Sequence, residues 1–254
     1  MMLPVPEKTV HQIYTDLLQP AFRQFGSAGE SIAKTICLLN LPFMYGALKY
    51  ELLVERFQRS LKKIPDKNLT SPPVNVIFQI SEKLMSMPED DPISEMYVQL
   101  LSSCSNIEYT DSVHPAFVNL ICQISGDEAL FIDILAQREL SVYIKRDESW
   151  EPPTETELDA LLVAWDGAML GAEPIREAVI HPEQFRVPKY FFTYLEHLKS
   201  LGIIEYINGP ENLLTPEFVY SLEGHGYWFI TLTKFGRLFY GVCINDPDVF
   251  SFIK

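Results

Sequence analysis

The first half of the chain carries apolar residues at intervals of three and four positions, which is the period of an amphipathic helix. This pattern predicts four helices, at about 9–25, 30–64, 74–87 and 93–103. A fifth helix should follow the loop at 106–112, with Asp111 or Ser112 as its cap and Pro115 in its first turn. Residues 1–124 are therefore predicted to form an all-helical domain.

The segment at 30–50 is almost wholly apolar, which raises the question of a membrane helix. Lys34, Asn40 and Lys49 interrupt it, and a spanning helix needs about 20 mostly apolar residues. Pro42 would also kink such a helix. We therefore expect burial within a helical bundle. The alternative is a membrane-active effector that inserts this segment into a bilayer after a trigger.

The second half of the chain mixes helical periods with short alternating stretches that are typical of strands. Asp127 and Glu128 begin a helix over about 127–137, where their negative charge suits the positive end of the helix dipole. The elements expected after it are a strand at 140–145, a helix that starts at the capping pair Thr154 and Glu157, a helix at 188–201, strands at 203–207 and 227–232, and a helix at 234–243. Gly202 should end the helix before it, and Thr233 should cap the last helix.

This order of elements resembles a winged helix over about 125–245, with the loop at 208–226 as its wing. The predicted fold class is therefore mainly α, with a helical N-terminal bundle followed by a winged-helix-like α+β sub-domain. The domains are expected at 1–124 and 125–254, and the second contains an acidic insert around Trp150.

The net charge is −14, and residues 127–177 hold 13 Asp and Glu against 4 Lys and Arg. A surface of this sign repels phosphate backbones and anionic lipids. The candidate recognition helix at 182–202 has three cations against two glutamates, and the loop at 208–226 has three glutamates and no Lys or Arg. Nucleic acid is therefore not expected as a partner, whereas protein is. A winged-helix transcriptional regulator is kept as an alternative.

One basic run occurs near the end of the second predicted helix: Arg56, Arg59, Lys62, Lys63 and Lys67. Cations are favourable at a helix C-terminus, so a solvated helix end explains the run. The alternative interpretation is a small patch for an acidic partner or for lipid headgroups.

Motifs of catalysis are missing from the sequence. The five histidines are scattered and the cysteines Cys37, Cys104, Cys122 and Cys243 are widely spaced, so neither a metal-site spacing nor a disulfide framework is present. No glycine-rich phosphate loop and no serine-hydrolase motif occurs. We therefore predict no enzyme activity and no catalytic, cofactor-binding or metal-binding residues. Buried thiols and the lack of a secretory signal predict a protein of the reducing cytoplasm.

Three phrases, in this order, resemble a bacterial family known as abortive infection alpha: NLTSPPVNV (68–76), SVHPAFVNLICQISGDEALFIDIL (112–135) and LTKFGRLFYGVC (232–243). ISEMYVQLLSSCSN (93–106) also fits, so the similarity covers roughly 50–245. The acidic insert around Trp150 departs from the family's pattern. The matching positions are Pro72, Pro73, His114, Pro115, Phe117, Leu232, Thr233, Gly236 and Arg237.

The resemblance implies phage defence in which an infected cell stops growing or dies. It brings no catalytic residue and no cofactor, so we expect the matching positions to be turn, cap and packing residues. The function predicted is that of a cytoplasmic, non-enzymatic defence protein that binds a protein partner or forms a homo-oligomer.

Overall fold

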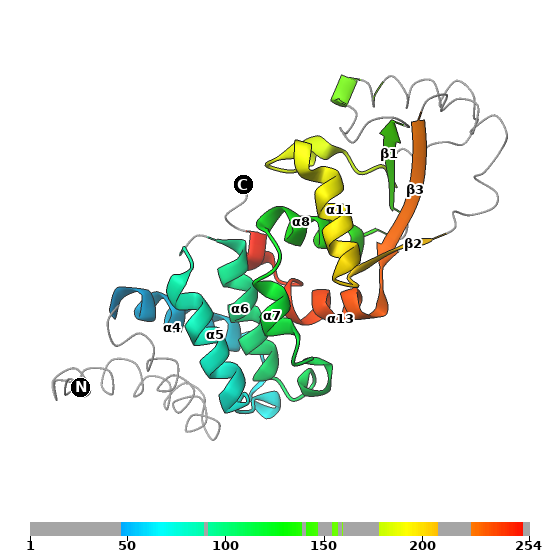
Figure 1. The fold of residues 1–254 in the computed structure, drawn as a ribbon. Helices are drawn as coiled ribbons and strands as arrows, with labels where there is room; N and C mark the ends of the chain where they lie inside the picture. Colours follow the sequence, from blue (N-terminus) through cyan, green and yellow to red (C-terminus); the bar gives the residue numbers. More distant parts are fainter. Residues whose placement is uncertain are drawn as a thin grey trace, which may run out of the picture. The chain divides into compact units, whose positions relative to one another are not determined.

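The computed structural model describes residues 47–88, 91–138, 141–146, 154–156, 159, 178–207 and 225–250 (Figure 1). The described residues divide into two compact units, one made of 47–123 with 242–250 and the other of 124–241. The expected helix at 9–25, most of the apolar segment at 30–50, Glu157 of the expected capping pair with Thr154, and nearly all of the loop at 208–226 lie outside the described residues. The division into domains at 124 and 125 stays a prediction.

The first unit consists of helices in its described part. They are α4 (Ala47–Leu61), α5 (Val74–Ser86), α6 (Pro92–Cys104) and α7 (Phe117–Ile121), with short 3-10 turns between and after them. The helices predicted at 74–87 and 93–103 are confirmed, and α4 is the described part of the one predicted at 30–64. Asp91 caps α6, because its carboxylate accepts a hydrogen bond from the backbone N–H of Ile93 at 3.0 Å.

Helix α6 lies at the centre of this unit. It contacts α4, α5 and α7 and also the 3-10 turn η8 (Pro247–Phe250) near the end of the chain. Twelve of its thirteen residues are buried. Within it, the Tyr97 hydroxyl donates to the Val118 carbonyl at 2.9 Å, and the Ser103 hydroxyl donates to the Val242 carbonyl at 2.9 Å. These two bonds tie Val118 of α7 and Val242 to one buried helix.

The start of α7 differs from the prediction. Asp111 and Ser112 lie in the 3-10 turn η4 (Thr110–Ser112), and α7 begins only at Phe117, so neither residue caps it. The reason is local, because a proline disfavours the helical conformation of the residue before it, which here is His114. The Nδ1 atom of His114 instead accepts a hydrogen bond from the backbone N–H of Ala116 at 3.1 Å.

The second unit contains one antiparallel sheet of three described strands. These are β1 (Ser141–Arg146), β2 (Ile204–Ile207) and β3 (His225–Leu232), in the spatial order β1-β3-β2. Helices α8 (Gly126–Ala136), α11 (Phe191–Ser200) and α13 (Lys234–Cys243) accompany it. These elements confirm the helices predicted at 127–137, 188–201 and 234–243 and the strands predicted at 140–145, 203–207 and 227–232, whereas the helix expected from Thr154 stays a prediction. The described part of the fold is therefore mainly helical, with one small sheet.

Aromatic side chains fill the space between α8, α11 and β1. The ring of Phe131 lies 5.1 Å from that of Phe185 and 5.4 Å from that of Phe191. Phe191 in turn lies 6.1 Å from Tyr143 on β1. All four side chains are buried. Rings at these separations gain from their mutual orientation as well as from burial, so this cluster fixes α11 beside the sheet (Figure 1).

The predicted helix end at Gly202 and the predicted helix cap at Thr233 are both confirmed. Gly202 ends α11 with a φ of 71°, in the left-handed region that glycine adopts without strain. Thr233 caps α13, since its hydroxyl oxygen accepts from the backbone N–H of Gly236 at 2.9 Å. The same hydroxyl donates to the carbonyl of Gly202 at 2.6 Å. The start of α13 is thereby joined to the turn that follows α11.

Asp133 links α8 to α13, because the Tyr240 hydroxyl donates to its carboxylate at 3.2 Å. Gln137 also donates to this carboxylate, at 2.7 Å. Both bonds favour the ionised form, but burial outweighs them and raises the pKa of Asp133 above the ordinary value for an aspartate.

We expect Asp133→Asn to stabilise the protein at neutral pH. A raised folded-state pKa means that the folded state binds the proton more tightly than the unfolded state does. The contribution of this group to the free energy of unfolding therefore improves as the pH falls through the raised pKa. Urea denaturation should show an advantage of the variant at about pH 7 that shrinks at about pH 4. A variant that is less stable than the wild type at neutral pH would contradict this.

Candidate functional site

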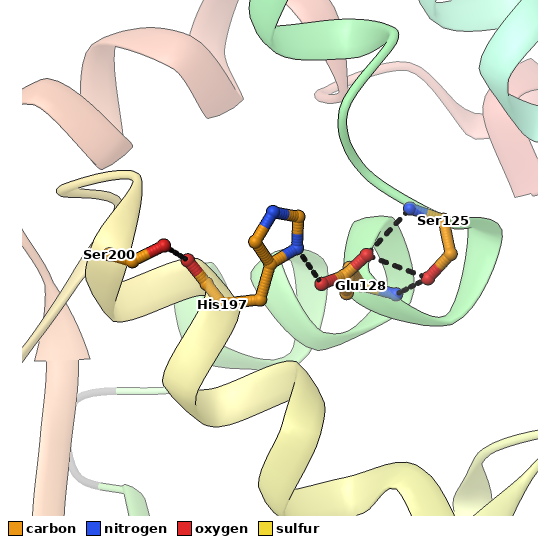
Figure 2. A network of polar contacts seen from close by, with 4 residues as sticks. All are labelled: Ser125, Glu128, His197 and Ser200. Atoms are coloured by element: carbon orange, nitrogen blue, oxygen red, sulfur yellow. Dashed lines mark hydrogen bonds and ion pairs between the residues drawn. The ribbon is translucent and has the colours of Figure 1, made fainter.

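The most elaborate polar cluster of the described residues lies at the N-terminus of α8. Ser125 is the N-cap, and its hydroxyl oxygen accepts from the backbone N–H of Glu128 at 3.3 Å. The Glu128 carboxylate returns to accept from the backbone N–H of Ser125 at 2.7 Å and from its hydroxyl at 2.8 Å (Figure 2). This is a complete capping box. From the sequence, Glu128 was expected only to interact with the helix dipole, although the Ser-x-x-Glu spacing at 125–128 is the local signal of a capping box.

Asp127, the neighbouring carboxylate, is only 7% exposed and receives three hydrogen bonds. The backbone N–H groups of Arg186 and Val187 donate to it at 3.1 Å each, and the Tyr194 hydroxyl donates at 2.8 Å. Burial, followed by the bond to Asp127, raises the pKa of Tyr194, so this hydroxyl stays a donor. Asp127 thus holds the turn before α11 and α11 itself against the start of α8.

Glu128 makes the second link between α8 and α11. One of its oxygens lies 2.6 Å from Nδ1 of His197, and the glutamate side chain is 6% exposed against 36% for the histidine. The second ring nitrogen of His197 points away from Glu128 (Figure 2). Ser200 lies one turn further along α11, and its hydroxyl donates to the carbonyl of His197 at 2.8 Å.

A carboxylate next to an imidazole is also found in catalytic sites, where it orients a general base. Where such a base activates a side-chain nucleophile, the two groups must lie within hydrogen-bond reach. The two hydroxyl groups drawn in Figure 2 are committed elsewhere, since that of Ser125 donates to Glu128 and that of Ser200 donates to a backbone carbonyl. Within the part of the chain that the structure describes, no group of three His, Cys, Asp or Glu side chains is placed to hold a metal ion. The hydrogen bonds of this cluster join α8 to α11.

The residues that carry the family resemblance fall into separate places. In the first unit, Pro72 is buried, Pro73 is the N-cap of α5, and the buried ring of Phe117 lies 5.7 Å from that of the exposed His114, which precedes Pro115. In the second unit, four positions meet where β3 joins α13: Leu232, Thr233, Gly236 and Arg237. The Arg237 guanidinium donates to the Thr231 hydroxyl at 3.0 Å.

Gly236 lies directly against the backbone of Ile203. A β-carbon added to it would lie well under 3.0 Å from the carbonyl oxygen of Ile203, which is a backbone atom. The same carbonyl accepts a hydrogen bond from the backbone N–H of Thr233 at 2.9 Å. The absence of a side chain at position 236 therefore lets α13 approach the start of β2.

The basic run of the first unit is partly paired. Arg56 lies 3.7 Å from Glu95 on α6, Arg59 lies 3.7 Å from Glu55 one turn earlier, and Lys63 lies 2.7 Å from Asp246. Lys62 and Lys67 are exposed. These ion pairs offset part of the positive charge, so a patch for an acidic partner or lipid stays a prediction.

Cys122 corrects the prediction of buried thiols. It is exposed at the C-cap of the short helix α7, and its thiol donates to the Asn119 carbonyl at 3.1 Å. A helix of five residues covers little more than one turn, so the residue after it falls outside the buried stripe. Cys104 and Cys243 are buried as predicted, and Cys37 lies outside the described residues.

In the native protein we expect iodoacetamide to alkylate Cys122 well before Cys104 and Cys243. Burial raises the pKa of Cys104 to about 12 and that of Cys243 well above its ordinary value, and the thiolate is the reactive form. Peptide mass mapping after a short exposure measures the order of labelling. In urea the three thiols should react at similar rates. Equal labelling of Cys104 and Cys122 in the folded protein would contradict the structure.

The fold and the cluster together define a mainly helical protein of two compact units, whose buried carboxylates serve packing between helices. Residues 48–243 match the family model described as abortive infection alpha. This match spans well over half of the chain, and the chain therefore belongs to the abortive infection alpha family, as the three phrases predicted. No curated protein and no solved structure matches it. None of the described helices is both long and apolar enough to cross a membrane.

Proposed function

We propose that the protein is a phage-defence protein of the abortive infection type, which stops the growth of an infected cell or kills it before phage multiply. It acts in the cytoplasm through contact with another protein rather than by catalysis. Membership of the abortive infection alpha family supports the defence role.

The observation that carries the contact mechanism is that Asp127 and Glu128 both form their hydrogen bonds within the fold. Both are buried acidic groups beside a histidine and a tyrosine, which is the kind of place where catalytic residues are sought first. Their oxygens are occupied by backbone N–H groups, the Ser125 hydroxyl, His197 and Tyr194. A carboxylate whose oxygens bond within the fold fixes how α8 and α11 pack. That packing determines the shape of the surface to which a partner protein would bind.

The finer fold that we propose is a helical bundle followed by a winged-helix-like unit. For the second part, the support is the chain order of β1, α11, β2, β3 and α13 and the antiparallel sheet order β1-β3-β2. For the first part, the support is the packing of α4, α5 and α7 around α6. In this proposal the winged-helix-like unit binds protein, because the loop at 208–226 has three glutamates and no Lys or Arg to meet phosphates.

The experiment that tests the proposed function is a phage challenge of bacteria that express the protein. We expect fewer plaques than on cells without it, over a panel of phages. At a high ratio of phage to cells, the infected culture should nevertheless fail to survive, because abortive infection protects the population and not the infected cell. Unchanged plaque numbers for every phage would contradict the defence role. Survival of the infected cells themselves would contradict the abortive mechanism.

A further inference from the structure

The two edges of the sheet in the second unit differ. At the β1 edge, the backbone N–H of Ile180 donates to the carbonyl of Val142 at 2.8 Å, so a neighbouring segment pairs there. The opposite edge is formed by β2 (Ile204–Ile207), and no described strand pairs with its outer side. This outer side of β2 is called the β2 edge below. An edge of this kind presents backbone groups that can pair with another chain.

The register shows which backbone groups point outward at the β2 edge. The carbonyl of Ile203 accepts a hydrogen bond at 2.9 Å from the backbone N–H of Thr233, at the end of β3, so this carbonyl points toward β3. In an antiparallel pair, successive residues of a strand direct their N–H and C=O groups alternately toward the partner strand and away from it. Counted from Ile203, the groups of Ile204 and Tyr206 therefore point outward.

The side chains of β2 leave its edge open to a further strand. Natural edge strands are commonly protected by lysine, proline or a bulge. The sequence of β2 is IEYI, with Glu205 as its single charge, and it pairs with β3 in a continuous register. Tyr206 and Ile207 are each 37% exposed. Isoleucine and tyrosine are also residues that strands favour.

We propose that the β2 edge pairs with the β2 edge of a second copy of the chain, antiparallel and about a two-fold axis, so that two three-stranded sheets become one continuous sheet. A two-fold axis pairs identical surfaces. Tyr206 lies on this axis, because its outward N–H and C=O groups can bond to those of the second Tyr206. An axis at Ile204 would instead oppose the turn at Gly202 to Tyr206, and a turn cannot continue the ladder.

The side chains of β2 suit this pairing. Opposite residues of an antiparallel pair share one face of the sheet, so the two Tyr206 rings would meet, and each Glu205 would lie opposite Ile207 of the other copy. The two glutamates are thereby kept from facing each other. The Tyr206 ring is already held, with the Nζ atom of Lys199 4.1 Å from its centroid and the Tyr143 ring at 6.2 Å. Little side-chain freedom is therefore lost on association.

Sedimentation velocity of the purified full-length protein tests for the dimer. We expect a reversible monomer–dimer equilibrium with a Kd below about 100 µM. Each chain has a net charge of −14, so two copies repel each other at long range. Raising the salt concentration screens this repulsion and should strengthen the dimer. This inference goes beyond the proposed function and does not rest on it.

A matched pair of variants locates the interface. Tyr206→Lys should raise the Kd of the dimer at least about tenfold, because two like charges would face each other across the axis and the paired rings would be lost. Tyr190→Lys is the control, since Tyr190 is a 47% exposed tyrosine at the other end of α11, and it should leave the Kd unchanged. Thermal melting checks that both proteins are folded.

Cysteine cross-linking locates the axis, in a protein whose exposed Cys122 is replaced by serine. Opposite α-carbons of a hydrogen-bonded antiparallel pair lie about 5.5 Å apart, within the range that a disulfide spans. Tyr206→Cys should therefore give a covalent dimer with oxidised glutathione. Glu205→Cys is the comparison, because two α-carbons at position 205 would lie roughly 8 Å apart, which is too far for a disulfide.

Three results would overturn the proposal: a wild-type protein that stays monomeric up to about 100 µM, a folded Tyr206→Lys protein that dimerises as the wild type does, or cross-linking of Glu205→Cys that equals that of Tyr206→Cys. None of these results bears on the defence role, which the phage challenge tests separately.

Discussion

Gly236→Ala is expected to lower the free energy of unfolding by about 2–3 kcal/mol, which is the cost of inserting a group where the surroundings cannot yield. The new β-carbon would lie well under 3.0 Å from the carbonyl oxygen of Ile203. This oxygen belongs to the backbone and already accepts from Thr233 at 2.9 Å, so it cannot move without loss of that bond. Helix α13 would have to shift away from the start of β2. Urea denaturation followed by circular dichroism measures the effect.

The matched control is Gly241→Ala on the same helix. A β-carbon at Gly241 would meet nothing within 4 Å. Alanine is the better helix former by about 1 kcal/mol, so this variant should be as stable as the wild type or slightly more stable. Equal destabilisation by both substitutions would show that any alanine in α13 is harmful and that the close approach to Ile203 is not the cause.

The second large effect is expected for Asp127→Ala, at about 3 kcal/mol, since three buried donors lose their common acceptor. The backbone N–H groups of Arg186 and Val187 and the hydroxyl of Tyr194 would be left without this partner. Asp127→Asn keeps one accepting oxygen and should cost less. The free energy of unfolding in urea and the loss of near-ultraviolet circular dichroism from the aromatic cluster both report the change.

Glu196→Ala is the comparison for this prediction. Glu196 is an exposed carboxylate on α11, the helix that Asp127 holds in place. Exposed charges contribute less than about 0.5 kcal/mol in most proteins, and alanine favours the helix. An Asp127→Ala protein as stable as the Glu196→Ala protein would mean that the bonds of Asp127 do not hold α11.

Local rules predicted much of this fold from the sequence. The helical periods gave α5, α6 and α8, the alternation gave β1, and the roles of Gly202 and Thr233 followed from their turn and cap chemistry. Each of these features depends on residues within a few positions of one another.

The features that could not be predicted depend on partners far along the chain. Asp127 binds the backbone some 60 positions away, at Arg186 and Val187, and Glu128 pairs with His197 at a separation of 69. No spacing rule connects such residues. The capping box at Ser125 is different, because its Ser-x-x-Glu pattern is local and was available in the sequence.

The charge of a segment also proved to be a poor guide to the charge of a surface. Asp127 and Glu128 count towards the acidity of residues 127–177, yet both are buried and hydrogen-bonded. They contribute to packing and little to the field that a partner meets. The charge of a surface therefore follows from the sequence only once the burial of each charged residue is known.

The most direct test of the contact mechanism is a phage challenge with variants of the carboxylate–imidazole pair. Glu128→Gln and His197→Asn remove this pair while an amide keeps much of its hydrogen bonding. We predict that both proteins, at equal abundance and folded, protect as the wild type does. Loss of protection by a folded Glu128→Gln or His197→Asn protein would contradict the claim that the protein acts by contact and not by catalysis.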